Sequence, residues 1–367
     1  MQLGLGVGPI ADTTTTPATT EGGAKPLVWR GTSFTWNQAV TTTEVGIGRD
    51  NIGGEDGFYG WDFLFTPNLY LVDLPKDKVN VFAEIGWHTE LTNAPDTVDY
   101  RETLFKDMQL GARYNRTLWQ NGGRDPGEYV TSGSFTTRLV LPTSDISRTQ
   151  GRYLVTAFSL GAKQQIKLLG KEADGLNNVT VGATGTYSHL FSRANQPTFT
   201  DTFRDRTNAS GNVFDSDVLS GRAYDTNRLT LGLTVGMPIY QDLAVAVQTR
   251  LIANFRHDFE SGGCDAPVDT APGGCADIPQ DPSRTRYQPL TTFDVALSYP
   301  IYEVVDVALG YSNETYWIGE DGQRRGIFYS PGAQFYLDIT ANLDVIYSKI
   351  TRRDQRPNAS RWAKAEY

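Results

Sequence analysis

The residues best suited to chemistry are acidic and basic side chains that recur at every second position within otherwise apolar segments. Carboxylates and guanidinium groups that face each other across a polar passage create a transverse field, which selects solutes. The same groups close the passage if they pair with each other and fill it. The residues expected to line it are Asp62, Glu84, His88, Asp107, Arg113, Arg138, Arg250, Arg256, Asp294, Asp338 and Asp344, and the same phase includes Glu90, Asp258, Asp306, Glu314, Lys163 and Arg228.

A period of two places these side chains on β-strands, and segment 243–259, LAVAVQTRLIANFRHDF, shows the pattern most clearly. Its odd positions are almost all apolar, whereas its even positions after Ala246 are polar except for Ile252. Soluble strands usually run about 5 to 6 residues, and a membrane-crossing strand needs roughly 9 to 11. The segment is therefore expected to be one strand of a transmembrane β-barrel.

The same alternation recurs along the chain, with turn signals between the segments. Strands are expected at 34–47, 59–71, 79–91, 104–118, 129–141, 154–168, 179–189, 229–239, 243–259, 287–301, 305–317 and 335–347. In the first of these the apolar phase slips between Val40 and Val45, which we interpret as a bulge. If Leu71 faces Val79 across the first tight hairpin, the register places Asp62 opposite His88.

The connectors alternate in length, and this pattern orients the barrel. Short turns at 73–77, 240–242 and 302–304 separate longer connectors rich in Gly, Asp, Asn, Pro or Arg. Bacterial outer-membrane barrels have short periplasmic turns, long extracellular loops and an even number of strands. Apolar and polar residues alternate without interruption through segment 335–347, which indicates one strand and not two. We therefore expect about twelve strands with both termini in the periplasm.

The expected fold class is thus all-β, a transmembrane antiparallel up-and-down β-barrel. It occupies residues 31–349, between a flexible periplasmic segment at 1–30 and a periplasmic tail at 350–367. The start of the chain lacks the basic and apolar regions of a secretion signal, although an outer-membrane protein must be exported. We therefore expect that a signal has been removed.

The charge and the remaining motifs exclude several functions. The formal net charge of -9 argues against nucleic acid as a partner, because phosphate binding needs a basic surface. GLGVG at 4–8 is not a dinucleotide fingerprint, since no strand precedes it. Asp215 and Asp217 lack the ordered spacing of a calcium loop. We expect no metal and no cofactor.

The two cysteines, Cys264 and Cys275, each follow a Gly-Gly pair in a segment rich in Pro and Asp. This arrangement predicts a disulfide that closes an extracellular loop in an oxidising compartment. A metal site would need further Cys or His side chains, and only His257 is close in sequence.

Besides a polar pathway for solutes and a closed structural barrel, a third possible function is that of a membrane-embedded hydrolase. His189 and His257 fall on the lipid phase near the outer ends of their strands, and Ser188 and Ser192 are near His189 in sequence. Catalysis requires a nucleophile, a base and an orienting group within hydrogen-bond reach. No recognisable catalytic motif surrounds either histidine, so we do not expect an enzyme.

The chain resembles Gram-negative outer-membrane β-barrel proteins as a class. LPTSDISR at 141–148, VALGYSN at 307–313 and GEDGQRRGIFYSPGAQFYL at 319–337 resemble segments of uncharacterised outer-membrane proteins of myxobacteria and relatives. Val345 and Tyr347 look like the hydrophobic-x-aromatic ending that the barrel assembly machinery recognises, with Asn342 where Gly is usual. The resemblance implies a location in the bacterial outer membrane.

The expected function is a narrow polar pathway for small solutes, porin-like or transporting. The alternative is a closed structural or docking barrel that anchors a cell-envelope complex. The implied partners are outer-membrane lipid and lipopolysaccharide, the barrel assembly machinery during biogenesis, and a periplasmic or envelope-complex partner.

Overall fold

The computed structural model describes residues 27–47, 58–92, 103–120, 129–144, 147–148, 151–167, 178–193, 206–207, 213–214, 224–240, 242–257, 286–317, 324–330 and 332–351. The sequence predictions for 1–26, for the two cysteines, for Asp215, Asp217 and Asp258, and for the tail after Thr351 lie outside these residues.

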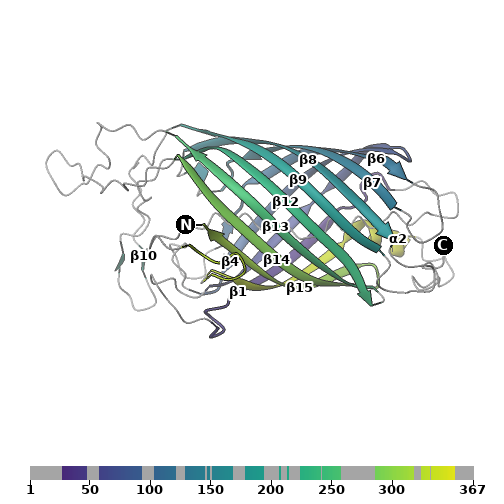
Figure 1. The fold of residues 1–367 in the computed structure, drawn as a ribbon. Helices are drawn as coiled ribbons and strands as arrows, with labels where there is room; N and C mark the ends of the chain where they lie inside the picture. The colour runs from purple at the N-terminus through teal and green to yellow at the C-terminus, as the bar shows by residue number, and fades with distance from the viewer. Residues whose placement is uncertain are drawn as a thin grey trace.

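The described residues form a closed antiparallel β-barrel of twelve strands (Figure 1). The strands are β1 (Ser33–Thr41), the broken strand β2 (Tyr59–Thr66) and β3 (Asn68–Asp73), β4 (Asp77–Glu90), the broken strand β5 (Thr103–Phe105) and β6 (Met108–Gln120), β7 (Tyr129–Leu141), β8 (Arg152–Lys167), β9 (Asn178–Ser192), β12 (Asp225–Tyr240), β13 (Leu243–Arg256), β14 (Tyr287–Ile301), β15 (Val305–Tyr316) and β16 (Gln334–Asn342). β1 pairs with β2 and with β16, and β2 also pairs with β4, so the sheet closes on itself.

Two further elements lie at opposite ends of the barrel in Figure 1. Helix α2 (Leu343–Thr351) follows the last strand directly, and the short strands β10 (Arg206–Thr207) and β11 (Val213–Phe214) pair beyond the other end. No helix within the described ranges is both long enough and apolar enough to cross a membrane.

The two faces of the wall differ in polarity. Large apolar side chains point outward and remain exposed, such as Leu160 at 67%, Leu233 at 59% and Leu309 at 59%. On the inner face polar side chains are covered, such as Asp294 at 3% and Asp338 at 7%. An apolar band around a barrel with a polar interior is the arrangement of a transmembrane barrel. The predicted fold class is confirmed.

Two strands are interrupted, and each interruption has a local cause. Pro67 separates β2 from β3 because proline has no N–H to donate, although Ala83 still donates its N–H to the Pro67 carbonyl at 3.1 Å. Between β5 and β6, the register against β4 shifts by one residue. This extra residue forms a bulge at Lys106 and Asp107, which turns both consecutive side chains toward the lumen.

Two predicted strands are too long. β1 ends at Thr41 in a hydrogen-bonded turn, where Ile47 donates to the Thr42 carbonyl, so the phase slip after Val40 marks the end of the strand and not a bulge. The last strand ends at Asn342. The prediction that residues 343–347 continue it is wrong, because they form the first part of α2.

The residues just before β1 cover the outer edge of β3, which β1 does not reach. Tyr70 donates its N–H to the Val28 carbonyl at 2.7 Å, and Asn68 Nδ2 donates to the Arg30 carbonyl at 2.7 Å. Arg30 also forms an ion pair with Asp73 at 2.6 Å. Residues 28–30 therefore belong with the barrel wall, although we predicted them as part of the flexible segment.

The connector before β16 folds back over the outer face of the barrel. Asn313 lies on the outward phase of β15 but is only 1% exposed, because its Nδ2 donates to the carbonyls of Gly326 and Ile327. Ser330 Oγ donates to Asn313 Oδ1 at 2.6 Å. We call residues 326–330 the outer flap; it covers a polar side chain on an otherwise apolar surface.

Replacing Asn313 with alanine is expected to release the outer flap. The change removes three side-chain hydrogen bonds, which corresponds to about 2 kcal/mol of local stability and a roughly thirtyfold larger open population. Trypsin cleavage after Arg324 or Arg325, followed by mass spectrometry, should accelerate accordingly. Ser312→Ala, one residue earlier on the opposite face, is the control and should leave the rate unchanged.

Candidate functional site: a charged lumen

Most of the acidic side chains and most of the arginines occupy different parts of the inner wall, and the exceptions include Asp107 in the bulge between β5 and β6 and Asp225 on β12. Carboxylates project inward from five of the six consecutive strands that run from β4 through β1 to β14, as Asp62 on β2, Glu84 on β4, Asp294 on β14, Glu314 on β15 and Asp338 on β16. Guanidinium groups project from the remaining arc, as Arg113 on β6, Arg138 on β7, Arg228 on β12 and Arg250 on β13. This segregation produces a field across the lumen.

The basic and acidic arcs meet at Arg250. Its side chain interacts electrostatically with Asp294 and Glu314 on the two next strands, and also with Arg138. β7 and β13 are separated by three strands in the sheet, so this interaction acts across the lumen. Arg250 Nη2 also donates to Gln248 Oε1 at 2.9 Å.

On the side away from Arg250, Asp294 accepts a hydrogen bond from a tyrosine whose ring reaches across the strand between them. Tyr336 on β16 lies flat over Gly310 on β15, and its hydroxyl donates to Asp294 Oδ1 at 3.0 Å. Only glycine leaves room for the ring at this position. Asp294 Oδ2 is buried without a hydrogen-bond partner among the described residues.

A second aromatic ring organises the basic arc. Phe82 on β4 lies over Gly111 on β6, and the guanidinium carbons of Arg113 and Arg138 lie 5.4 Å and 5.7 Å from its ring centroid. Cations at this distance are attracted to the ring face. Arg138 Nε is buried and has no hydrogen-bond partner within the described part of the chain. The Phe82 ring thus contacts both arginines of this part of the basic arc.

Asp62 contacts its predicted partner, His88, and also a lysine, Lys106. His88 Nδ1 lies 2.9 Å from Asp62 Oδ1, and the register places the two residues opposite each other, as predicted. The expected Leu71–Val79 pair does not form, because a shift after Tyr70 places Val72 opposite Val79. Lys106 Nζ also lies 2.5 Å from Asp62 Oδ1, because the bulge turns Lys106 inward.

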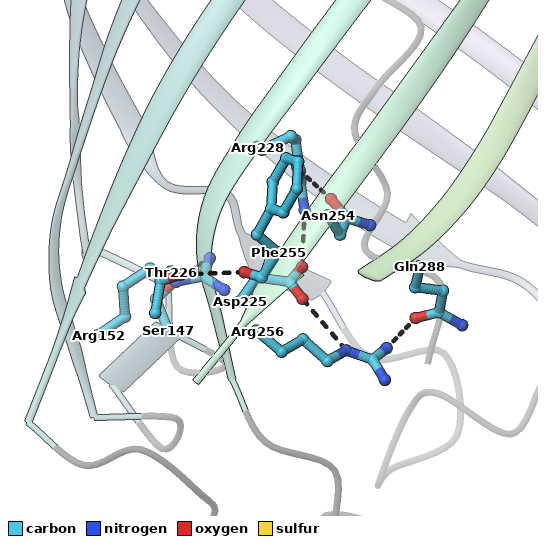
Figure 2. Close-up of polar contacts among 9 residues, drawn as sticks. All are labelled: Ser147, Arg152, Asp225, Thr226, Arg228, Asn254, Phe255, Arg256 and Gln288. Atoms are coloured by element: carbon cyan, nitrogen blue, oxygen red, sulfur yellow. Dashed lines mark hydrogen bonds and ion pairs between the residues drawn. The ribbon is translucent and has the colours of Figure 1, made fainter. Parts of the chain in front are cut away.

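At the end of the barrel near β10, three arginines surround one carboxylate (Figure 2). Arg228 Nη2 contacts Asp225 Oδ2 at 3.3 Å, and Arg256 Nε contacts Asp225 Oδ1 at 3.4 Å. Arg152 interacts electrostatically with Asp225 and donates to Ser147 Oγ at 3.5 Å. We call Arg152, Asp225, Arg228 and Arg256 the mouth cluster.

Two neutral side chains and a connector support the mouth cluster. Arg228 Nε donates to Asn254 Oδ1 at 2.7 Å, and Arg256 Nη2 donates to Gln288 Oε1. Asp107 accepts hydrogen bonds from the Ser144 N–H and the Ser147 hydroxyl, so the bulge also fixes the connector beside Arg152. The arrangement holds three cations at the entrance in a fixed geometry.

The structure places most predicted lumen residues on the inner face. Asp62, Glu84, His88, Asp107, Arg113, Arg138, Arg250, Arg256, Asp294 and Asp338 lie on luminal positions of the wall or its bulge, and Asp344 does not, because it lies in the first turn of α2. The residues that the prediction missed are Lys106, Arg152, Asp225 and Tyr336.

His189 lies on the outward face of the barrel, as predicted. Its Nδ1 and the Tyr187 hydroxyl both contact Asn227 Oδ1, at 2.8 Å and 2.7 Å. Ser188 pairs with Arg228 and points inward, because adjacent residues of a strand face opposite sides. Ser188 is therefore not a nucleophile for His189. Among the described residues no group of three or more His, Cys, Asp or Glu side chains forms a metal-binding arrangement.

Fold and site together define a transmembrane antiparallel β-barrel with a charged lumen. No family profile and no curated protein matches the chain. Among solved structures, the KdgM porin in complex with disordered oligogalacturonate is 7% identical with a TM-score of 0.34, covering 84% of this chain and 98% of the porin. The transport unit of the autotransporter AIDA-I from Escherichia coli is 9% identical with a TM-score of 0.35, covering 89% and 93%.

A third similar structure is the translocator domain of the autotransporter NalP from Neisseria meningitidis. It is 10% identical with a TM-score of 0.34, and the match covers 84% of this chain and 86% of that domain. At these values the likenesses support no inference about activity, and the assignment of the barrel rests on its own strand pairing. The resemblance to myxobacterial proteins and the Cys264–Cys275 disulfide stay predictions.

Proposed function

We propose that the protein lies in the outer membrane of a Gram-negative bacterium and that its lumen is a narrow polar pathway for small solutes. The observation that supports this most is the segregation of charge, with Arg113, Arg138 and Arg250 on one arc and Asp294 and Asp338 on the other. A lumen filled only for stability would pair each charge with its neighbour. Separated arcs instead leave a field through which solutes pass.

The buried atoms of the lumen fit the same proposal. Asp294 Oδ2 offers an acceptor and Arg138 Nε a donor, and neither has a partner among the described residues. Buried polar groups are normally hydrogen-bonded, so both atoms would gain a partner if the side chains that cover them moved aside for a polar solute. The lumen therefore suits small polar solutes better than apolar ones.

The alternative is a closed barrel that serves a structural or docking role. The arc from β13 to β16 favours it, because Ile252, Asn254, Leu290 and Tyr336 are each at most 7% exposed and fill the interior on that side. In this reading the charges hold the wall in shape, and an envelope complex uses the barrel as an anchor. Conductance distinguishes the two readings.

Purified protein in a planar lipid bilayer is expected to give discrete open-channel steps. Arg250→Gln removes one cation beside Asp294 and Glu314, so the ratio of cation to anion permeability should rise by about fivefold, the equivalent of about 1 kcal/mol. Asp294→Asn should shift the reversal potential in the opposite direction. Arg193→Gln, which removes an exposed arginine just after β9, is the matched control.

A quiet bilayer that contains correctly inserted protein would refute the pathway and support the closed barrel. Insertion is checked by the altered electrophoretic mobility of folded, unheated barrel. Steps with the same ion selectivity in all variants would also contradict the proposal, because the current would then bypass the charged arcs.

A further inference from the structure

The outward face of the barrel contains a hollow of about 800 Å³ over β3, β4, β6 and β7. Its lining includes Leu69, Val81, Ala83, Leu110, Ala112 and Leu139. The register explains its shape, because Ala83 pairs with Leu110 and Ala112 pairs with Val81 and Thr137. Small side chains thus form a floor between leucines, of which Leu69, Leu110 and Leu139 are each more than 40% exposed. We call this hollow the outer groove.

A tryptophan closes one end of the outer groove. Trp29 belongs to the segment that covers the edge of β3, and its carbonyl accepts a hydrogen bond from Thr32 Oγ1 at 2.7 Å. Its ring packs edge-on against Tyr347 of α2, with centroids 5.3 Å apart. Tryptophan is enriched where a membrane meets water, so this end of the groove lies at that boundary.

Positive charge lies beyond the same end. Leu110, Ala112, Tyr114 and Arg116 share the outward row of β6, and at about 3.3 Å per residue Arg116 is roughly 13 Å from Ala112. Arg116 is 56% exposed and its Nε is 3.7 Å from Asp77 Oδ1, which also accepts the Tyr114 hydroxyl. An exposed pair of this length contributes little, so the guanidinium group is available to a phosphate.

A second cation lies next to Arg116. The N–H of Thr117 donates to the carbonyl of Lys76 at 2.9 Å, which brings the short turn between β3 and β4 beside the end of β6. Lys76 is exposed in that turn. The surface thus combines an apolar groove with two cations at its membrane boundary, which matches a molecule with an anionic head and a hydrocarbon chain.

We propose that the outer groove binds a glycerophospholipid from the leaflet at the short-turn end, with one acyl chain in the groove and its phosphate at Arg116. In a membrane this wall contacts hydrocarbon, and an empty hollow would forfeit dispersion contacts along its whole lining. An acyl chain in the groove gains no hydrophobic free energy relative to an acyl chain in the surrounding bilayer. Retention of the lipid therefore depends on packing in the groove and on the charge-assisted contact between its phosphate and Arg116. The inference rests on the membrane location proposed above but not on an open lumen.

Native mass spectrometry of the delipidated full chain in dodecyl maltoside, with phosphatidylglycerol added, tests the proposal. The wild type should retain one lipid per barrel. Ala112→Phe fills the floor of the groove and should lower retention at least tenfold, and Arg116→Gln should lower it severalfold. Val235→Phe places the same aromatic ring on the outward face of β12, away from the outer groove, and should retain the lipid like the wild type.

Equal retention by Ala112→Phe and the wild type would overturn the proposal, as would equal losses in Ala112→Phe and Val235→Phe. If Ala112→Phe does not fold, Ala83→Leu replaces it, since Ala83 belongs to the same floor. Selective retention of lipopolysaccharide over phosphatidylglycerol would also contradict it. Bilayer conductance is measured separately, so loss of lipid binding in a conducting barrel refutes this inference alone.

Discussion

Replacing Gly310 with alanine is expected to lower the free energy of unfolding by about 2 to 5 kcal/mol. A Cβ at this position overlaps the Tyr336 ring far inside van der Waals contact, so the ring must leave. Its departure also breaks the hydrogen bond to Asp294, whose other oxygen already has no partner among the described residues. Asp294, which is only 3% exposed, then loses the hydrogen bond that the Tyr336 hydroxyl donates to it.

Equilibrium urea unfolding in lipid vesicles, followed by tryptophan fluorescence, measures this effect. Gly236→Ala is the matched control, because it is also a glycine on the inner face, and its Cβ would meet nothing closer than the Val245 carbonyl at 3.8 Å. Tyr336→Phe separates the two contributions, since it keeps the ring and removes only the hydrogen bond. Equal stability of Gly310→Ala and Gly236→Ala would show that the ring does not occupy this space.

Asp225→Ala is expected to destabilise the entrance by about 2 to 3 kcal/mol. The change leaves the guanidinium groups of Arg228 and Arg256, which are 13% and 20% exposed, without the carboxylate between them. Arg152 loses the same electrostatic partner. Because the unpaired charges attract anions, added sulfate should restore part of the stability of the variant but have little effect on the wild type.

The control for this variant is Asp306→Ala. Asp306 Oδ2 accepts a hydrogen bond from Asn342 Nδ2 at 2.8 Å, and its loss leaves a neutral amide and not a cation. We expect a cost of about 1 kcal/mol and no response to sulfate. Thermal unfolding of both variants with and without sulfate provides the comparison. Identical losses in the two variants would show that the mouth cluster is not held by Asp225.

Alternation along the sequence was enough to find the strands and most of the lumen, because inward and outward positions follow from a period of two. It placed Asp62 opposite His88 and put Arg250 and Asp294 on one face, as the structure does. It failed wherever a strand contains an extra residue. Lys106 and Asp225 reach the lumen through irregularities in β5–β6 and β12, and nothing in the alternation marks them.

The end of the last strand was missed for a different reason. Leu343, Ile346, Tyr347 and Ile350 also fit a helical period, so the local sequence is compatible with both structures. The lengths of the neighbouring strands β1 and β15 decide between a strand and a helix. Asn342 is paired with Ser33, the first residue of β1, and Val305, the first residue of β15, pairs with Ala341, so no strand remains to accept hydrogen bonds from residues further on. A helix satisfies those backbone groups internally.

The pairing of β1 with β16 also determines the order in which the barrel assembles. Most other neighbouring strands lie close together in the chain, whereas the Asn37–Asp338 contact joins residues 301 positions apart. Closing a loop of that length costs about 5 kcal/mol of chain entropy. The seam therefore forms last, after the local hairpins have reduced the effective length of the loop. Until then the chain exposes the edges of β1 and β16, and this late intermediate is the species most exposed to pairing with another chain.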